Sequence, residues 1–91
     1  MIELRLRSGQ IVAFDGRVVE VFDSASAAER IHVAQAEALS ATDPNGGSVI
    51  AFRNCSTLLR FAREEAPARA RLLAAIESAR EADAPHVVPS E

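Results

Sequence analysis

Residues 49–80 read VIAFRNCSTLLRFAREEAPARARLLAAIESAR, and this stretch decides the fold. Two short apolar runs come first, Val49–Phe52 and Leu58–Phe61, and each has the length of a strand. Pro67 then opens a segment with a clear helical period, at the position where a missing N–H is harmless. Its apolar residues recur at i, i+3, i+4 and i+7: Leu72, Ala75, Ile76 and Ala79. The pattern predicts a β-hairpin followed by a helix whose buried stripe covers a sheet built upstream.

The first 22 residues predict a three-stranded antiparallel meander. Apolar and charged residues alternate through residues 2–7, as they do in a strand with one buried face. Ser8-Gly9 and Asp15-Gly16 supply tight turns, because glycine accepts the positive φ that such turns need. The second and third strands are then Ile11–Phe14 and Arg17–Phe22.

The next segment supports two interpretations. Ser24 can cap a helix over Ser24–Ser40 that is rich in alanine, which gives the order βββ-α-ββ-α. That helix would bury little, because its face is nearly all alanine and Val33 falls on the opposite side. The preferred interpretation alternates turns and strands: a helical turn at Ser24–Ala28, a strand at Arg30–Val33, a turn at Ala34–Glu37 and a strand at Ala38–Thr42.

The remaining boundaries follow from turn residues and prolines. Asp43–Gly47 contains proline, asparagine and two glycines, which predicts a turn. The C-terminal helix is expected to end near Ala82. We therefore predict one domain over residues 1–82 and a disordered tail over residues 83–91, which holds Pro85 and Pro89.

This order of elements resembles the pleckstrin homology (PH)-like superfold. The segment RIHVAQAEAL, residues 30–39, is similar to the strand–turn–strand of small bacterial PH-like domains. The resemblance covers residues 1–82 and implies a mainly β, α+β fold: a bent antiparallel sheet, or partly open barrel, closed by one C-terminal α-helix. The chain lacks the tryptophan that eukaryotic PH domains carry in that helix, and its first hairpin loop is only Ser8-Gly9. The resemblance therefore implies a fold and not a lipid ligand.

The composition limits which classes of partner and which cellular location we expect for the protein. The 91 residues carry a net charge of −3, and all 10 basic residues are arginine, so a nucleic-acid partner is not expected. Excess alanine and arginine suggests a GC-rich bacterial genome. The single cysteine, Cys55, excludes an internal disulfide framework. Without a long apolar run or a signal sequence at the start, we expect no transmembrane segment and a cytoplasmic location.

No set of residues in the sequence has the spacing of a catalytic or metal site. His32 and His86 lack neighbouring ligands at metal spacing, and Cys55 has no adjacent base. We therefore expect a protein that is not an enzyme and that uses no cofactor and no metal.

The main functional hypothesis is an interaction module that binds a protein partner or a second copy of itself. Short strands leave unpaired edges, and the first strand or Arg30–Val33 could offer one. Val87 and Val88, in a β-prone run between two prolines, could pair with such an edge.

The alternative is weak binding of anionic lipid or phosphate through Arg5 and Arg7, with Arg17 as a third basic residue. Contact with a membrane surface would then be peripheral. A structural explanation for the same arginines is a solvated strand face paired with carboxylates such as Glu20.

Overall fold

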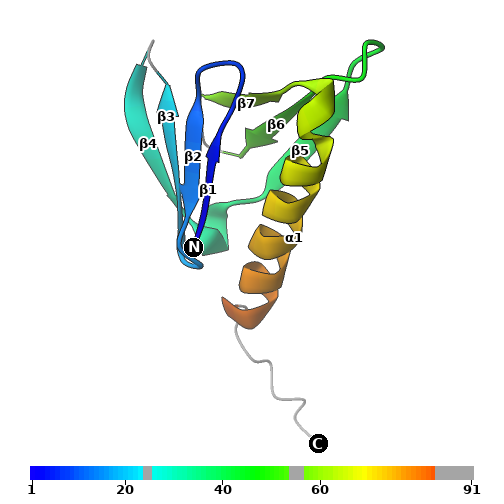
Figure 1. Cartoon of the computed structure of the whole chain (residues 1–91). Coiled ribbons are helices and arrows are strands. Elements are labelled where there is room, and N and C mark those ends of the chain that lie inside the picture. Colours follow the sequence, from blue (N-terminus) through cyan, green and yellow to red (C-terminus); the bar gives the residue numbers. More distant parts are fainter. Residues whose placement is uncertain (24–25, 54–56, 84–91) are drawn as a thin grey trace, which may run out of the picture.

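The computed structural model describes residues 1–23, 26–53 and 57–83, which form two antiparallel sheets and one long helix (Figure 1). In the first sheet the strand order is β1-β2-β3-β4: β1 Ile2–Arg5, β2 Ile11–Phe14, β3 Val18–Asp23 and β4 Ser26–His32. In the second it is β5-β6-β7: β5 Ala38–Thr42, β6 Ser48–Phe52 and β7 Leu58–Phe61. Short 3-10 turns, η1 Val33–Gln35 and η2 Arg63–Glu65, precede β5 and the helix α1, Ala66–Asp83.

The mainly β, α+β fold class predicted from the sequence is confirmed. All neighbouring strands pair antiparallel, and the one long helix of the described chain is C-terminal. The arrangement is compatible with a PH-like sandwich, although neither sheet closes on itself within the described residues. Helix α1 includes Asp83, one residue beyond the expected boundary, and residues 84–91 lie outside the described part.

The ambiguous middle segment adopts the turn-and-strand interpretation and not the continuous helix. β4 pairs with β3 from Val18↔His32 to Asp23↔Ser26, with a register shift between Val21 and Asp23. The predicted helical turn at Ser24–Ala28 is wrong for residues 26–28, which belong to β4. Pairing with β3 outweighs the local helix propensity of the alanines, since propensity is a weak preference that tertiary contacts override.

The helical stripe is buried as the sequence predicted. Leu72 and Ile76 lie in the core, and Leu73, Ala75 and Ala79 pack partly against it. From the sheets the core receives alternate strand residues, chiefly Val12, Val19, Val21, Ile50 and Leu59. Burying a leucine or isoleucine side chain contributes about 1.5–3 kcal/mol, so α1 is a principal source of stability.

Figure 1 shows α1 beside β1, with β5 passing behind the helix. Both strands are at the edges of their sheets. The helix therefore lies near one edge of each sheet. Among the described residues, no helix combines the length and the hydropathy that a membrane crossing requires.

Candidate interaction site

A groove of about 300 Å³ lies between α1 and the edge of the second sheet. Its apolar lining comes from η1, β5 and the middle of the helix: Ala36, Ala38, Leu73 and Ile76. Polar groups border it: Glu37, Ser40, Glu77 and Arg80. The side chains that β5 contributes are small, so the groove stays open beside the strand.

The backbone of β5 is unpaired on the side that faces away from β6. Glu37 O accepts from Arg53 N at 3.1 Å, and Asp43 N donates to Gly47 O at 2.8 Å. These contacts bracket β5 and show that its odd-numbered residues bond to β6, since bonded pairs alternate in an antiparallel ladder. The N–H and C=O groups of the even-numbered residues, Ala38, Ser40 and Thr42, therefore point outward. No described strand pairs with this edge.

Two arginines of α1 reach toward the chain on either side of the groove. Arg69 Nη1 donates to Ser40 Oγ at 2.9 Å, and Arg80 Nη1 donates to Val33 O at 3.1 Å and Ala34 O at 3.3 Å. The second contact ties the C-terminal half of the helix to η1. Arg69 Nε is buried without a hydrogen-bond partner in the described part of the chain.

The other edge of the second sheet is closed by a side chain. Gln10 Nε2 donates to Leu58 O at 2.6 Å, and Gln10 Oε1 accepts from Arg60 N at 2.8 Å. Leu58 and Arg60 are the β7 residues whose backbone groups point away from β6. Gln10 thus occupies the position that a neighbouring strand would take.

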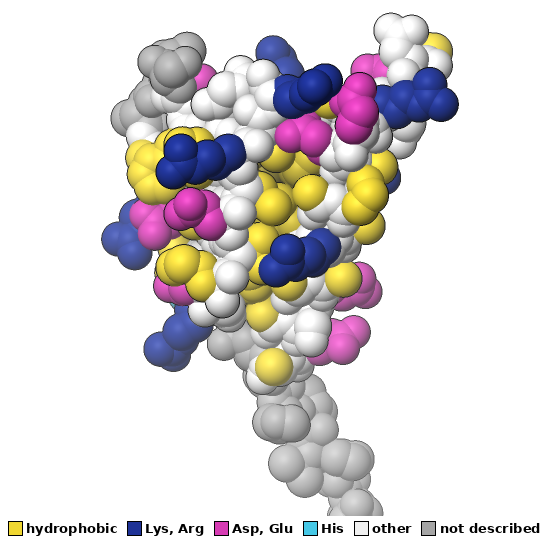
Figure 2. Space-filling view, in the orientation of Figure 1, with side chains coloured by type: hydrophobic (Ala, Val, Ile, Leu, Met, Phe, Trp, Pro, Cys, Tyr) yellow, Lys and Arg dark blue, Asp and Glu magenta, His cyan; other side chains and the backbone are white. Residues whose placement is uncertain are grey.

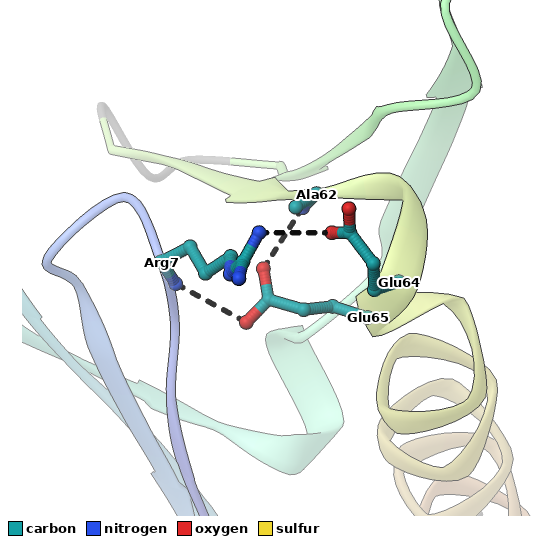
Figure 3. Close-up of polar contacts among 4 residues, drawn as sticks. All are labelled: Arg7, Ala62, Glu64 and Glu65. Carbon is teal, nitrogen blue, oxygen red and sulfur yellow. Dashed lines mark hydrogen bonds and ion pairs between the residues drawn. The ribbon is translucent and has the colours of Figure 1, made fainter.

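A carboxylate closes one end of the β1 edge (Figure 3). Glu65 Oε2 accepts the backbone N–H of Arg7 at 3.1 Å, and Glu65 Oε1 accepts that of Ala62 at 2.8 Å. The Arg7 guanidinium points to Glu64 and lies 3.4 Å from its Oε2. Glu65 therefore links the first hairpin to the start of α1.

The three arginines predicted to bind an anion do not converge. Arg5 and Arg7 lie at the end of β1 near the first hairpin, where Arg5 pairs in register with Ile11. Arg17 follows the turn at the opposite end of β2. Arg5 Nε is 3.9 Å from Glu3 Oε1. Anion binding by these arginines remains a prediction, and the geometry gives it no shared site.

Glu20 pairs with Arg30 across β3 and β4 at 3.6 Å, and not with the arginines of β1. The two strands proposed as open edges, residues 2–7 and 30–33, overlap β1 and β4, which lie at the edges of the first sheet. The predicted ranges run too far, because Leu6 and Arg7 follow β1 and Val33 belongs to η1. Val87 and Val88 are outside the described residues, as are Cys55 and His86.

His32 has a local structural contact. Its Nδ1 accepts the backbone N–H of Ala34 at 3.1 Å and so caps η1. The described residues contain no group of three or more His, Cys, Asp or Glu side chains placed to hold a metal ion.

A second hollow, of about 410 Å³, lies between the first sheet and the C-terminal half of α1. Apolar side chains line much of it: Met1, Ile2, Phe14, Ala75, Ala79 and Ala82. Figure 2 shows hydrophobic side chains gathered between the first sheet and the helix, with charged groups around them.

Sequence reasoning missed Gln10, Arg69 and the clamp made by Glu65. Gln10 follows a turn and resembles an ordinary hairpin residue in the sequence, and Arg69 is one of four arginines near the helix start. Of the three, only Glu65 could have been noticed in the sequence, since acidic residues suit the positive end of a helix.

No family model, curated protein or solved structure matches the chain.

Proposed function

We propose that this protein is a non-catalytic interaction module that binds an extended segment by adding it to the outer edge of β5. The observation that carries the proposal is the coincidence of two features. The outward backbone groups of Ala38, Ser40 and Thr42 supply a hydrogen-bonding edge, and the groove beside them receives side chains. Main-chain bonds give affinity in such complexes, and pockets for alternate side chains give specificity.

β5 is the most suitable of the four sheet edges. Gln10 blocks β7, and β1 carries two charged side chains, Glu3 and Arg5, along its four residues. β4 presents charged residues, Glu29 and Arg30, which hinder pairing with another strand. β5 has no charged side chain along its length, and it lies beside an apolar hollow.

The geometry defines the chemistry of the bound segment. It would be extended, with a small or medium apolar side chain directed at Leu73 and Ile76. Polar side chains of the segment would face the groove's border at Glu37, Glu77 and Arg80. Another protein could supply such a segment, and so could residues 86–88 of a second copy of this chain.

Substitutions at Ser40 test the edge directly. Ser40→Pro removes an N–H that points outward, so it blocks strand addition but leaves the β5–β6 ladder intact. Ser40→Ala keeps the N–H and removes only the bond to Arg69, which makes it the matched control. A displayed library of random nonapeptides would be selected on the wild-type chain, and the enriched peptides measured on both variants.

We expect the enriched peptides to alternate apolar and polar residues and to bind Ser40→Pro at least tenfold more weakly than Ser40→Ala. Peptides that bind Ser40→Pro as well as the wild type would contradict the proposal, as would a selection that enriches nothing. Light scattering separates the two sources of segment. If a second copy supplies it, Val87→Asp with Val88→Asp will reduce a dimer mass to that of a monomer.

A further inference from the structure

The sequence after α1 carries two prolines placed symmetrically about a valine. Residues 84–91 read APHVVPSE, so Pro85 and Pro89 each lie two positions from Val87. In an extended chain, residues two apart point their backbone groups to the same side, and the residue between them points to the other. The positions without an N–H therefore share one side with Val87. His86 and Val88 would present complete backbone groups on the other side.

The outer edge of β5 also uses alternate residues. Its outward groups belong to Ala38, Ser40 and Thr42, whereas Leu39 bonds to β6. A segment laid antiparallel along this edge, as all the described strand pairs run, places Leu39 in a pair without hydrogen bonds. Side chains are closest in such pairs. Leu39 is 60% exposed and its partner on β6 is only an alanine, so an apolar residue of the segment would cover it.

We propose that residues 86–88 of a second copy of this chain bind the edge of β5, antiparallel to it and with Val87 opposite Leu39. The inference rests on the proposed function and names its partner. In this register Val88 lies opposite Ala38, on the side of β5 that borders the apolar groove. One valine thus covers the exposed leucine and the next enters the groove.

Other registers fit less well. A shift by one residue in either direction would place Pro85 opposite a residue of β5 whose backbone groups point outward, and proline has no N–H to donate there. A shift by two residues would place a polar residue, Ser90 or His86, opposite Ala38 at the apolar groove. The spacing of the prolines and valines therefore selects a single register.

The prolines also limit how far the sheet can grow. Once the segment is bound, its free side presents the backbone groups of residues 85, 87 and 89. Two of these are prolines, which are found at sheet edges because they cannot donate to a further strand. The bound segment therefore ends the sheet.

A chain cannot place its own Val87 opposite its own Leu39. Arg69 contacts Ser40, and α1 continues from Arg69 to Asp83 for about 21 Å, at about 1.5 Å per residue. Residues 84–87 span at most about 14 Å when fully extended, so they cannot return to Ser40. The segment must come from another molecule.

The test compares proline substitutions at two adjacent positions of the full chain. Val88→Pro removes an N–H that donates to β5 in the proposed register, whereas Val87→Pro removes one that points away from it. The two variants are therefore matched controls for each other. Sedimentation velocity over a range of concentrations gives the dissociation constant of self-association for each. Ser40→Pro and Ser40→Ala report on the edge of β5 itself.

We expect the wild type to self-associate, Val88→Pro to weaken association by about tenfold, and Val87→Pro to weaken it by less than about threefold. Equal losses in the two variants would overturn the proposal. A wild type that stays monomeric up to about 1 mM would overturn it too, and the proposed function would still stand if selected peptides bind β5. Association that is the same in Ser40→Pro and Ser40→Ala would show that the segment binds elsewhere and overturn the proposal.

Discussion

The side-chain oxygen of Gln10 accepts the backbone N–H of Arg60 at 2.8 Å, and this contact joins the two sheets. The nitrogen of the same carboxamide donates to Leu58 O at 2.6 Å and to Asp23 Oδ2 at 3.1 Å. The Gln10 side chain thus forms hydrogen bonds with the N–H of Arg60 and the C=O of Leu58, the two β7 backbone groups that an additional strand would otherwise pair with. Gln10 is only 5% exposed, so water cannot replace these bonds if the side chain is removed.

Gln10→Leu should destabilise the protein by about 1–3 kcal/mol, because it leaves the N–H of Arg60 and the C=O of Leu58 unsatisfied in a buried position. The matched control is Gln35→Leu, the same substitution at an exposed glutamine of η1, which should change stability by less than about 0.5 kcal/mol. Denaturant midpoints measure both. Hydrogen exchange of the Arg60 amide should also accelerate, and equal effects of the two substitutions would show that Gln10 does not close the edge.

Leu72→Ala should cost about 2–5 kcal/mol, as truncations of buried leucines do. Leu72 is fully buried under the sheets, whereas Leu39 is 60% exposed, so Leu39→Ala is the control with the same chemistry. For a domain that holds roughly 5–15 kcal/mol in total, the first substitution removes a large share of the stability. An unchanged urea midpoint in Leu72→Ala would mean that α1 does not pack against the sheets as described.

The helix and the strands could be predicted because their patterns are local. The stripe of α1 repeats every 3.6 residues, and Ile2 and Leu4 alternate with charged neighbours. Residues 26–28 were predicted wrongly because Ser26, Ala27 and Ala28 favour a helical turn locally, and only pairing with β3 makes them a strand.

The candidate site could not be predicted because it depends on contacts between distant segments. Ser40 and Arg69 are 29 residues apart, and Gln10 and Arg60 are 50 apart. Sequence reasoning found the strand at Ala38–Thr42 but not that one side of it faces α1. It also could not show which residues of β5, β6 and β7 lie side by side on one face, because that requires the register of three strands.

Stability should decrease in acid partly through Asp15. Its Oδ1 accepts the backbone N–H groups of Arg17 at 2.8 Å and Val18 at 2.9 Å, and these bonds lower the pKa of the carboxyl. A depressed pKa in the folded state stabilises the protein above the unfolded pKa of about 3.9, and this contribution is lost as the pH falls through the folded pKa. The urea midpoint of wild type should therefore approach that of Asp15→Asn between pH 5 and pH 2. A constant difference would exclude this role.

We expect no sedimentation of the protein with anionic vesicles at physiological salt. Arg17 lies at the other end of β2, so at most Arg5 and Arg7 face a membrane together. Each basic residue near such a surface contributes about 1 kcal/mol. Two of them cannot hold a protein of net charge −3. Strong binding that is lost in Arg5→Ala with Arg7→Ala would instead support the lipid hypothesis.

Glu65→Gln should destabilise the protein by about 1–2 kcal/mol. The Glu65 carboxylate accepts two backbone N–H groups, those of Arg7 and Ala62, one on each oxygen. The glutamine amide has a single oxygen, so it can accept only one of the two in the same way. Glu64→Gln is the control. It removes the same charge at the same end of α1, but Glu64 makes only an exposed ion pair, worth less than about 0.5 kcal/mol. Urea unfolding compares the two variants, and hydrogen exchange of the Arg7 amide should accelerate only in Glu65→Gln. Equal losses in both would mean that charge at the helix start matters and that the clamp between the first hairpin and α1 does not.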